Sequence, residues 1–118
     1  IPIHFGGPVE QARGFVLHSL DYMREGTIRV DDNVGLSATL DILQCIATRR
    51  GPMRHMMALG YTGWGSGQLE NEIKGNGWIV VPADDDLIFD DDLDGKWSRA
   101  MAKIGVTPFS LSRQVGNA

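Results

Sequence analysis

The stretch that says most about the fold reads Leu59-Gly60-Tyr61-Thr62-Gly63-Trp64-Gly65-Ser66-Gly67-Gln68-Leu69-Glu70. The apolar run that leads into it, from His55 to Tyr61, is typical of a buried strand. Closely spaced glycines then mark a turn, and the residues from Gln68 to Lys74 have the composition of a helix. Gly75-Asn76-Gly77 supplies the stop signal for that helix. The stretch therefore predicts a strand, a glycine-rich turn and a short helix in direct succession.

On either side of this stretch the chain shows further strand signals. Apolar residues alternate with other residues near position 3, Gly14 to His18 forms a second candidate, and Thr27 to Val30 forms a third before Asp31. The run from Trp78 to Pro82 is a fourth, so that the expected strands lie near residues 3, 16, 28, 58 and 80.

Two other segments carry a helical period. From Leu36 the apolar residues recur on one helical stripe, with Ser37 as the expected N-cap and Arg49-Arg50-Gly51-Pro52 as the stop. A later helix is expected around Trp97 to Ile104, capped by Asp94 and closed by Gly105, and the acidic stretch before it is expected to be loop. Helices are too few for regular strand and helix alternation. We therefore predict an α+β fold, a mixed and mostly antiparallel sheet packed by two to three helices.

Composition places the chain among globular proteins and excludes several functions. It has 118 residues, of which 42% are hydrophobic and 22% charged, which indicates a single domain over residues 1–118 built around one core. The net charge of −4 disfavours direct nucleic-acid binding, and no apolar run reaches the roughly 20 residues of a membrane span. The single cysteine, Cys45, is expected to be a core thiol and indicates a reducing cytoplasm.

The glycine turn is the candidate ligand site, formed by Gly63, Trp64, Gly65, Ser66 and Gly67. Free backbone N–H groups at a helix start can bind an anion. The turn nevertheless lacks the lysine of a phosphate loop, and two glutamates follow it. The other interpretation is structural, with glycines that permit close approach and Trp64 packed over a residue of the following helix. The alternative to a role through protein contacts is therefore a small-ligand or anion-binding module, or an undiscovered enzyme, with its site at the turn from Gly60 to Gly67.

The remaining chemical motifs are incomplete. Asp90, Asp92, Asp94 and Gly95 match four positions of a calcium loop, but Met101 stands where a bidentate glutamate is needed. We expect a solvated acidic loop there. The histidines lack metal-ligand spacing and the serines lack a nucleophile elbow. The sequence thus predicts no metal, no cofactor and no catalytic residue, and it favours a protein that is not an enzyme.

The three tryptophans are expected to belong to the core. Trp78 opens an apolar run, and Trp97 shares a helical stripe with Ala100, Met101 and Ile104. We predict that all three are mostly buried and that replacing Trp64 by alanine costs on the order of 3 kcal/mol.

Several segments together resemble the AlgH/YqgE family of bacterial proteins. The resemblance covers nearly the whole chain and is carried by Gly6-Gly7-Pro8-Val9, Gly14 to His18, Ala38 to Leu43, Leu59 to Ile73, Trp78, Phe89, Trp97 with Ala100, and Gly116-Asn117-Ala118. Its most specific element is the stretch from Leu59 to Glu70, in which Thr62 stands where alanine is expected. Gly77 likewise replaces a larger residue before Trp78.

The resemblance implies a regulatory role and an incomplete domain. One branch of the family is linked by name to transcriptional regulation of alginate production, and the family supplies no agreed catalytic residues. Family members begin with further strands and a helix before the Gly-Gly-Pro segment, so this chain resembles their C-terminal two thirds. We therefore expect a cytoplasmic protein that acts through an unidentified protein partner, with no membrane contact. We also expect self-association, or pairing with the missing N-terminal segment, along the strand from Ile1 to Phe5.

Overall fold

A computed structural model describes residues 2–106 of the chain. By its internal contacts the chain divides into two compact units, a sheet unit over residues 1–63 and a helical unit over residues 64–118. The prediction that residues 1–118 form a single domain stays a prediction.

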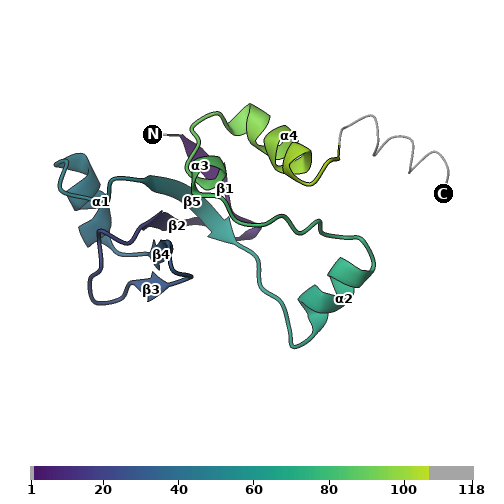
Figure 1. Cartoon of the computed structure of the whole chain (residues 1–118). Helices are drawn as coiled ribbons and strands as arrows, with labels where there is room; N and C mark the ends of the chain where they lie inside the picture. The colour runs from purple at the N-terminus through teal and green to yellow at the C-terminus, as the bar shows by residue number, and fades with distance from the viewer. Residues whose placement is uncertain (1, 107–118) are drawn as a thin grey trace. The chain divides into compact units, whose positions relative to one another are not determined.

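The sheet unit contains five strands. They are β1 (Ile3–Phe5), β2 (Val9–Ser19), β3 (Ile28–Arg29), β4 (Val34–Ser37) and β5 (His55–Tyr61), in the spatial order β1-β5-β2-β4-β3. Only the β1–β5 pair is parallel; β2–β5, β2–β4 and β3–β4 are antiparallel. Figure 1 shows β2 and β5 side by side, with β4 and β3 beyond β2. The predicted mixed, mostly antiparallel sheet is confirmed.

The two faces of this sheet carry different residues, because successive side chains of a strand point to opposite faces. Val16 and His18 of β2 are buried on one face. The helix α1 (Leu40–Ala47) contributes the fully buried Ile42, and Val16, Tyr22 and Ile42 form the core cluster of the unit. Leu43, Cys45 and Ile46 pack against that cluster, which confirms the prediction that Cys45 is a thiol at the core.

At one end of the sheet, backbone crosses backbone so closely that only glycine fits. Gly60 has a φ of +78°, and a Cβ there would overlap the carbonyl oxygen of Gly7 and lie 3.2 Å from the carbonyl oxygen of Val9. A Cβ on Gly6 would in turn overlap the carbonyl of Gly60, and the Gly6 N–H donates to the Leu59 carbonyl at 2.8 Å. The glycines at this crossing are therefore needed because a side chain would prevent the two backbone segments from approaching each other.

One strand and one helix boundary differ from the sequence prediction. Ser37, expected to cap α1, is the last residue of β4, and α1 begins at Leu40 after the N-cap Thr39. The strand is short and follows a turn in which the Asp31 carboxylate accepts the N–H groups of Asn33 and Val34. The helical period starting at Leu36 was therefore wrong by one turn, because Leu36 belongs to the sheet.

The helical unit contains α2 (Gln68–Lys74), α3 (Asp85–Ile88) and α4 (Leu93–Lys103). The predicted strand from Trp78 to Pro82 is wrong: these residues form no strand. Ile79 and Val80 are 47% and 67% exposed, so the apolar run has no pairing strand to cover it. A β-branched run forms a strand only where another strand is available to pair with it.

The acidic stretch is also more ordered than predicted. It contains α3, whose N-cap Asp84 accepts the Asp86 N–H at 3.0 Å. The cap of α4 is Asp92, which accepts the Gly95 N–H at 3.2 Å, and not Asp94, which lies in the first helical turn. The predicted end of this helix is confirmed, because Gly105 follows it with a φ of +77°.

Candidate functional site

The glycine turn is closed by its own helix. The Gly65 N–H donates to Gln68 Oε1 at 2.9 Å, and the Gln68 N–H donates to the Gly65 carbonyl at 3.0 Å. Gly67 is the N-cap of α2, with a φ of +75° and open space around it. The amide of Gly65 is thus already used inside the turn. The prediction that residues 63–67 bind a ligand stays a prediction.

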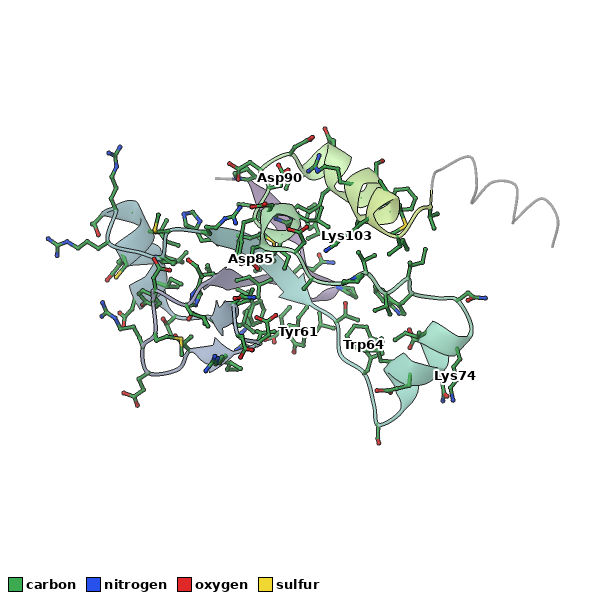
Figure 2. The ribbon with its side chains drawn as sticks, viewed as in Figure 1. Tyr61, Trp64, Lys74, Asp85, Asp90 and Lys103 are labelled. Carbon is green, nitrogen blue, oxygen red and sulfur yellow. The ribbon has the colours of Figure 1, made fainter. Side chains whose placement is uncertain are left out.

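Beside this turn two tryptophans meet. The rings of Trp64 and Trp78 lie edge to face, with centroids 5.6 Å apart and planes at 72°. The indole N–H of Trp78 donates to Glu72 Oε1 at 3.0 Å. We call Trp64, Gln68, Glu72 and Trp78 the tryptophan corner. Figure 2 shows Trp64 beside α2, whose last residue is Lys74.

The tryptophans are not core residues, contrary to the sequence prediction. Trp64 is 37% exposed, Trp78 47% and Trp97 52%. The ring that Trp64 contacts is Trp78, which the sequence separates from it by the whole of α2. Helical and strand periods place a residue on a face of its own element but do not reveal whether another element covers that face. The predicted 3 kcal/mol for Trp64→Ala loses its basis, since it assumed full burial.

The carboxylate of the corner is held in its ionised form. The hydrogen bond from Trp78 is the main cause that lowers the pKa of Glu72 below its ordinary value, opposed by burial and reinforced by Gln68 and Trp64. A charged carboxylate at this point repels anions. The corner therefore suits a cationic or neutral group better than the anion considered for the turn.

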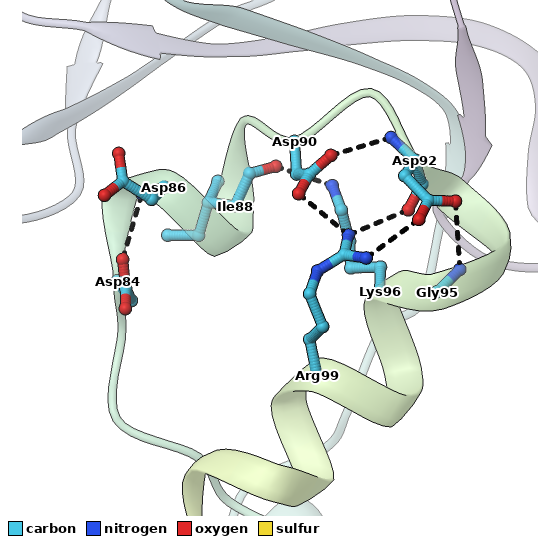
Figure 3. A network of polar contacts seen from close by, with 8 residues as sticks. All are labelled: Asp84, Asp86, Ile88, Asp90, Asp92, Gly95, Lys96 and Arg99. Carbon is cyan, nitrogen blue, oxygen red and sulfur yellow. Dashed lines mark hydrogen bonds and ion pairs between the residues drawn. The ribbon is translucent and has the colours of Figure 1, made fainter.

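A second polar cluster joins α3 to α4 (Figure 3). The Arg99 guanidinium contacts the Asp90 and Asp92 carboxylates, at 2.9 Å each, and also donates to the Asp92 carbonyl at 3.0 Å. The Lys96 ammonium donates to the Ile88 carbonyl at 2.6 Å, and burial is the main cause that lowers the pKa of Lys96. Two of the aspartates that resemble a calcium loop are thus ion-paired with Arg99.

The same interactions govern the acid behaviour of this cluster. The hydrogen bond from Arg99 is the main cause that lowers the pKa of Asp92 below its ordinary 3.8. The pKa of Asp84 is lowered as well: burial opposes the shift, but the N–H groups of Asp86 and Leu87 and the Lys103 ammonium outweigh it. Within residues 2–106 no group of three histidine, cysteine, aspartate or glutamate side chains is placed to hold a metal ion. The cluster is an ion-paired corner of the helical unit.

A groove runs over the sheet face opposite the core cluster. It has a volume of about 580 Å³ and is lined mainly by apolar side chains of three neighbouring strands, with Arg13 and Tyr61 toward one end. The apolar side chains that β2, β4 and β5 contribute are Phe15, Leu17, Leu36, Met56 and Ala58. The strand register explains the set, because Leu17 pairs with both Leu36 and Met56 and so shares their face. Sequence reasoning missed this groove, since β4 was not predicted.

At the polar end of the groove, the charged and aromatic side chains contact one another. The Arg13 guanidinium contacts the Glu10 carboxylate at 3.4 Å and lies 5.1 Å from the centroid of the Phe15 ring. The Phe15 and Tyr61 rings meet edge to face at 5.8 Å. A hydrogen bond with Glu10 is the main cause that raises the pKa of Tyr61. The groove thus ends in a neutral polar group of three residues and is otherwise apolar.

A buried series of hydrogen bonds through His18, Ser37 and Thr27 was not predicted from the sequence. The ring of His18, fully buried, lies with Nδ1 2.8 Å from the Ser19 carbonyl oxygen and Nε2 2.9 Å from Ser37 Oγ. A carbonyl only accepts, so Nδ1 carries the proton and the Ser37 hydroxyl donates to Nε2. Thr27 Oγ1 lies 2.8 Å from Ser37 Oγ and completes the chain. Ser37 is 2% exposed, so its hydroxyl is not accessible as a nucleophile; its contact with His18 links β4 to β2.

Comparison with known proteins places the chain in a family. The sequence matches the AlgH-like family over residues 1–109, and the chain belongs to that family. It is 53% identical over 118 residues to a UPF0301 protein of Rhodospirillum rubrum and 56% identical over 117 residues to one of Agrobacterium fabrum. These matches cover 100% and 99% of this chain but 62% and 58% of the relatives. The chain therefore spans about three fifths of the length of the curated relatives it matches.

A solved structure agrees with the fold. The solution structure of the AlgH protein from Pseudomonas aeruginosa matches with a TM-score of 0.78 and 38% identity, over 95% of this chain and 59% of that one. The α+β class and the family resemblance drawn from the sequence are both confirmed. No helix in residues 2–106 has the length and apolar character that crossing a bilayer requires.

Proposed function

We propose that this protein is a cytoplasmic regulatory protein that acts by contact with another protein, and that the groove on its sheet unit receives the partner. The supporting observation is the groove itself, which has a volume of about 580 Å³ and a mainly apolar lining that includes Phe15 and Met56. An exposed apolar groove rimmed by polar residues is commonly a contact site. The regulatory part of the proposal rests on the family resemblance, since the names of the relatives state no activity.

The charge distribution favours a protein partner over nucleic acid. The sheet unit carries six acidic and six basic residues, and residues 64–118 carry nine acidic and five basic ones, so the whole net charge of −4 lies in the second half. DNA affinity rests mainly on lysines and arginines that neutralise phosphates. Neither half has the excess of basic residues that such contacts need.

The cytoplasmic part of the proposal is supported by the cysteine content. A lone free cysteine, Cys45, is compatible with a reducing compartment.

The test uses a photo-crosslinking amino acid at position 58, in the floor of the groove, with Gln44 on the exposed side of α1 as the matched control position. We expect the probe at position 58, and not at 44, to link one specific protein in living cells. A strain with Ala58→Glu should then share the transcript changes of a deletion strain, while Gln44→Glu should not. Equal crosslinking from both positions, or an unchanged transcript profile in the deletion strain, would refute the proposal.

A further inference from the structure

The tryptophan corner offers two partly exposed indole side chains next to a negative charge. Trp64 and Trp78 remain 37% and 47% exposed although their rings touch. Arg13 lies over the Phe15 ring and Arg24 over the Tyr22 ring. Both belong to the sheet unit. Within the described part of the chain, the indoles of the corner carry no such cation of their own.

The chemistry of the corner selects for a cation. Indole is the strongest cation–π acceptor among the aromatic side chains. The Trp78 N–H donates to the Glu72 carboxylate, and donation to an anion pushes electron density into the ring and makes its face more negative. The ionised carboxylate adds a direct attraction to any cation that reaches the corner. Ring faces and carboxylate thus act in the same direction.

We propose that the tryptophan corner binds an arginine side chain presented by a basic segment of a partner protein. A guanidinium group is planar and weakly hydrated, so it stacks on an indole face while its N–H groups reach a carboxylate, which an ammonium does less well. Charge complementarity points the same way, because residues 64–118 carry nine acidic and five basic side chains. Tryptophan and arginine are also the residues that dominate protein interfaces.

This inference stands apart from the proposed groove contact. The corner lies wholly in residues 64–78 and the groove wholly in residues 6–61. An experiment on one leaves the other intact. If the tryptophan corner binds no arginine side chain, the proposal that the groove receives a partner protein is therefore unaffected.

The experiment is a titration of the protein with a short arginine-rich peptide, followed by the three indole N–H signals in nuclear magnetic resonance spectra. We expect saturable shifts of the Trp64 and Trp78 signals, with Trp97 as the internal control, because Trp97 is 52% exposed but lies outside the corner. A peptide with citrulline in place of arginine keeps the shape and loses the charge. It should bind about tenfold or more weakly, as expected for the loss of a cation–π contact.

Variants locate the effect. Glu72→Gln keeps an acceptor for the Trp78 N–H but removes the charge, and Trp64→Leu removes one face; each should weaken binding of the arginine peptide about tenfold. Trp97→Phe should leave it unchanged. Equal binding of the citrulline peptide, equal shifts at Trp97, or no saturable shift at all would overturn the proposal. If a variant fails to fold, the comparison of the two peptides on the unaltered protein still decides the matter. Tighter binding of a lysine peptide would likewise overturn the choice of arginine.

Discussion

The replacement Gly60→Ala tests the backbone crossing between Gly60 and the Gly6-Gly7 turn. An alanine at a φ of +78° costs about 1 kcal/mol in backbone strain. Its Cβ would also overlap the Gly7 carbonyl oxygen and lie 3.3 Å from the Gln11 Cα, and backbone atoms on both sides cannot step aside as a flexible side chain would. Forcing such an overlap costs about 2 kcal/mol more. We expect a total destabilisation of about 3 kcal/mol.

The matched control is Gly26→Ala in the same unit. Gly26 has a φ of +88°, but a Cβ there would meet only the Thr39 Cγ2 atom, at an ordinary 3.7 Å. Its replacement should therefore cost only the backbone strain, about 1 kcal/mol. The assay is urea unfolding followed by far-ultraviolet circular dichroism, since all three tryptophans lie in the helical unit. Equal unfolding midpoints for the two variants would refute the argument from close approach.

Three further outcomes follow from the described contacts. Ser37→Ala leaves the buried Nε2 of His18 without its donor and should lower the free energy of unfolding by about 1 to 3 kcal/mol, measured by urea unfolding. An unchanged free energy of unfolding would show that this hydrogen bond does not stabilise the fold. Because the pKa of Asp92 is below 3.8 in the folded protein, its pairing with Arg99 stabilises the helical unit above about pH 4 and is lost as the pH falls through that lowered pKa. Acid titration of the tryptophan fluorescence should show this, and Arg99→Met should move the transition to higher pH; an unmoved transition would contradict the assignment. On the edge strand β1, Phe5 is 91% exposed, so we expect the chain to self-associate there and Phe5→Lys to reduce the mass seen by light scattering; a monomeric unaltered chain would end that expectation.

The sequence predicted the parts of the fold that depend on local patterns. The strand from His55 to Tyr61, the turn after it and the helix from Gln68 to Lys74 are where the pattern placed them. The strand β4 was not predicted, because it is short and because Leu36 fits a helical stripe as well as a strand. The apolar run after Trp78 failed for the opposite reason, since its composition is right for a strand but no strand pairs with it.

The candidate site was predicted less well because it depends on contacts between distant residues. Its turn could be found from glycine spacing, and Trp64 was identified as part of it. The edge-to-face partner Trp78 and the acceptor Glu72 could not be found in that way, because they meet Trp64 only once α2 has formed and the chain has turned back. The groove needed the register of three strands, which periodicity alone does not fix.

The position of β1 in the sheet has a consequence for the order in which the sheet unit folds. Ile3 pairs with Met57, so β1 finds its partner only after β2, β3, β4 and α1 have been made. The antiparallel pairs among β2, β4 and β3 close much shorter loops and can form first. During synthesis β1 leaves the ribosome before β2, β3, β4 and β5, yet its partner β5 is the last of these strands to be made. Until β1 docks, the backbone edge of β5 is open to pairing, so crowding of nascent chains should favour exchange of β1 between copies over exchange of β2, β3 or β4.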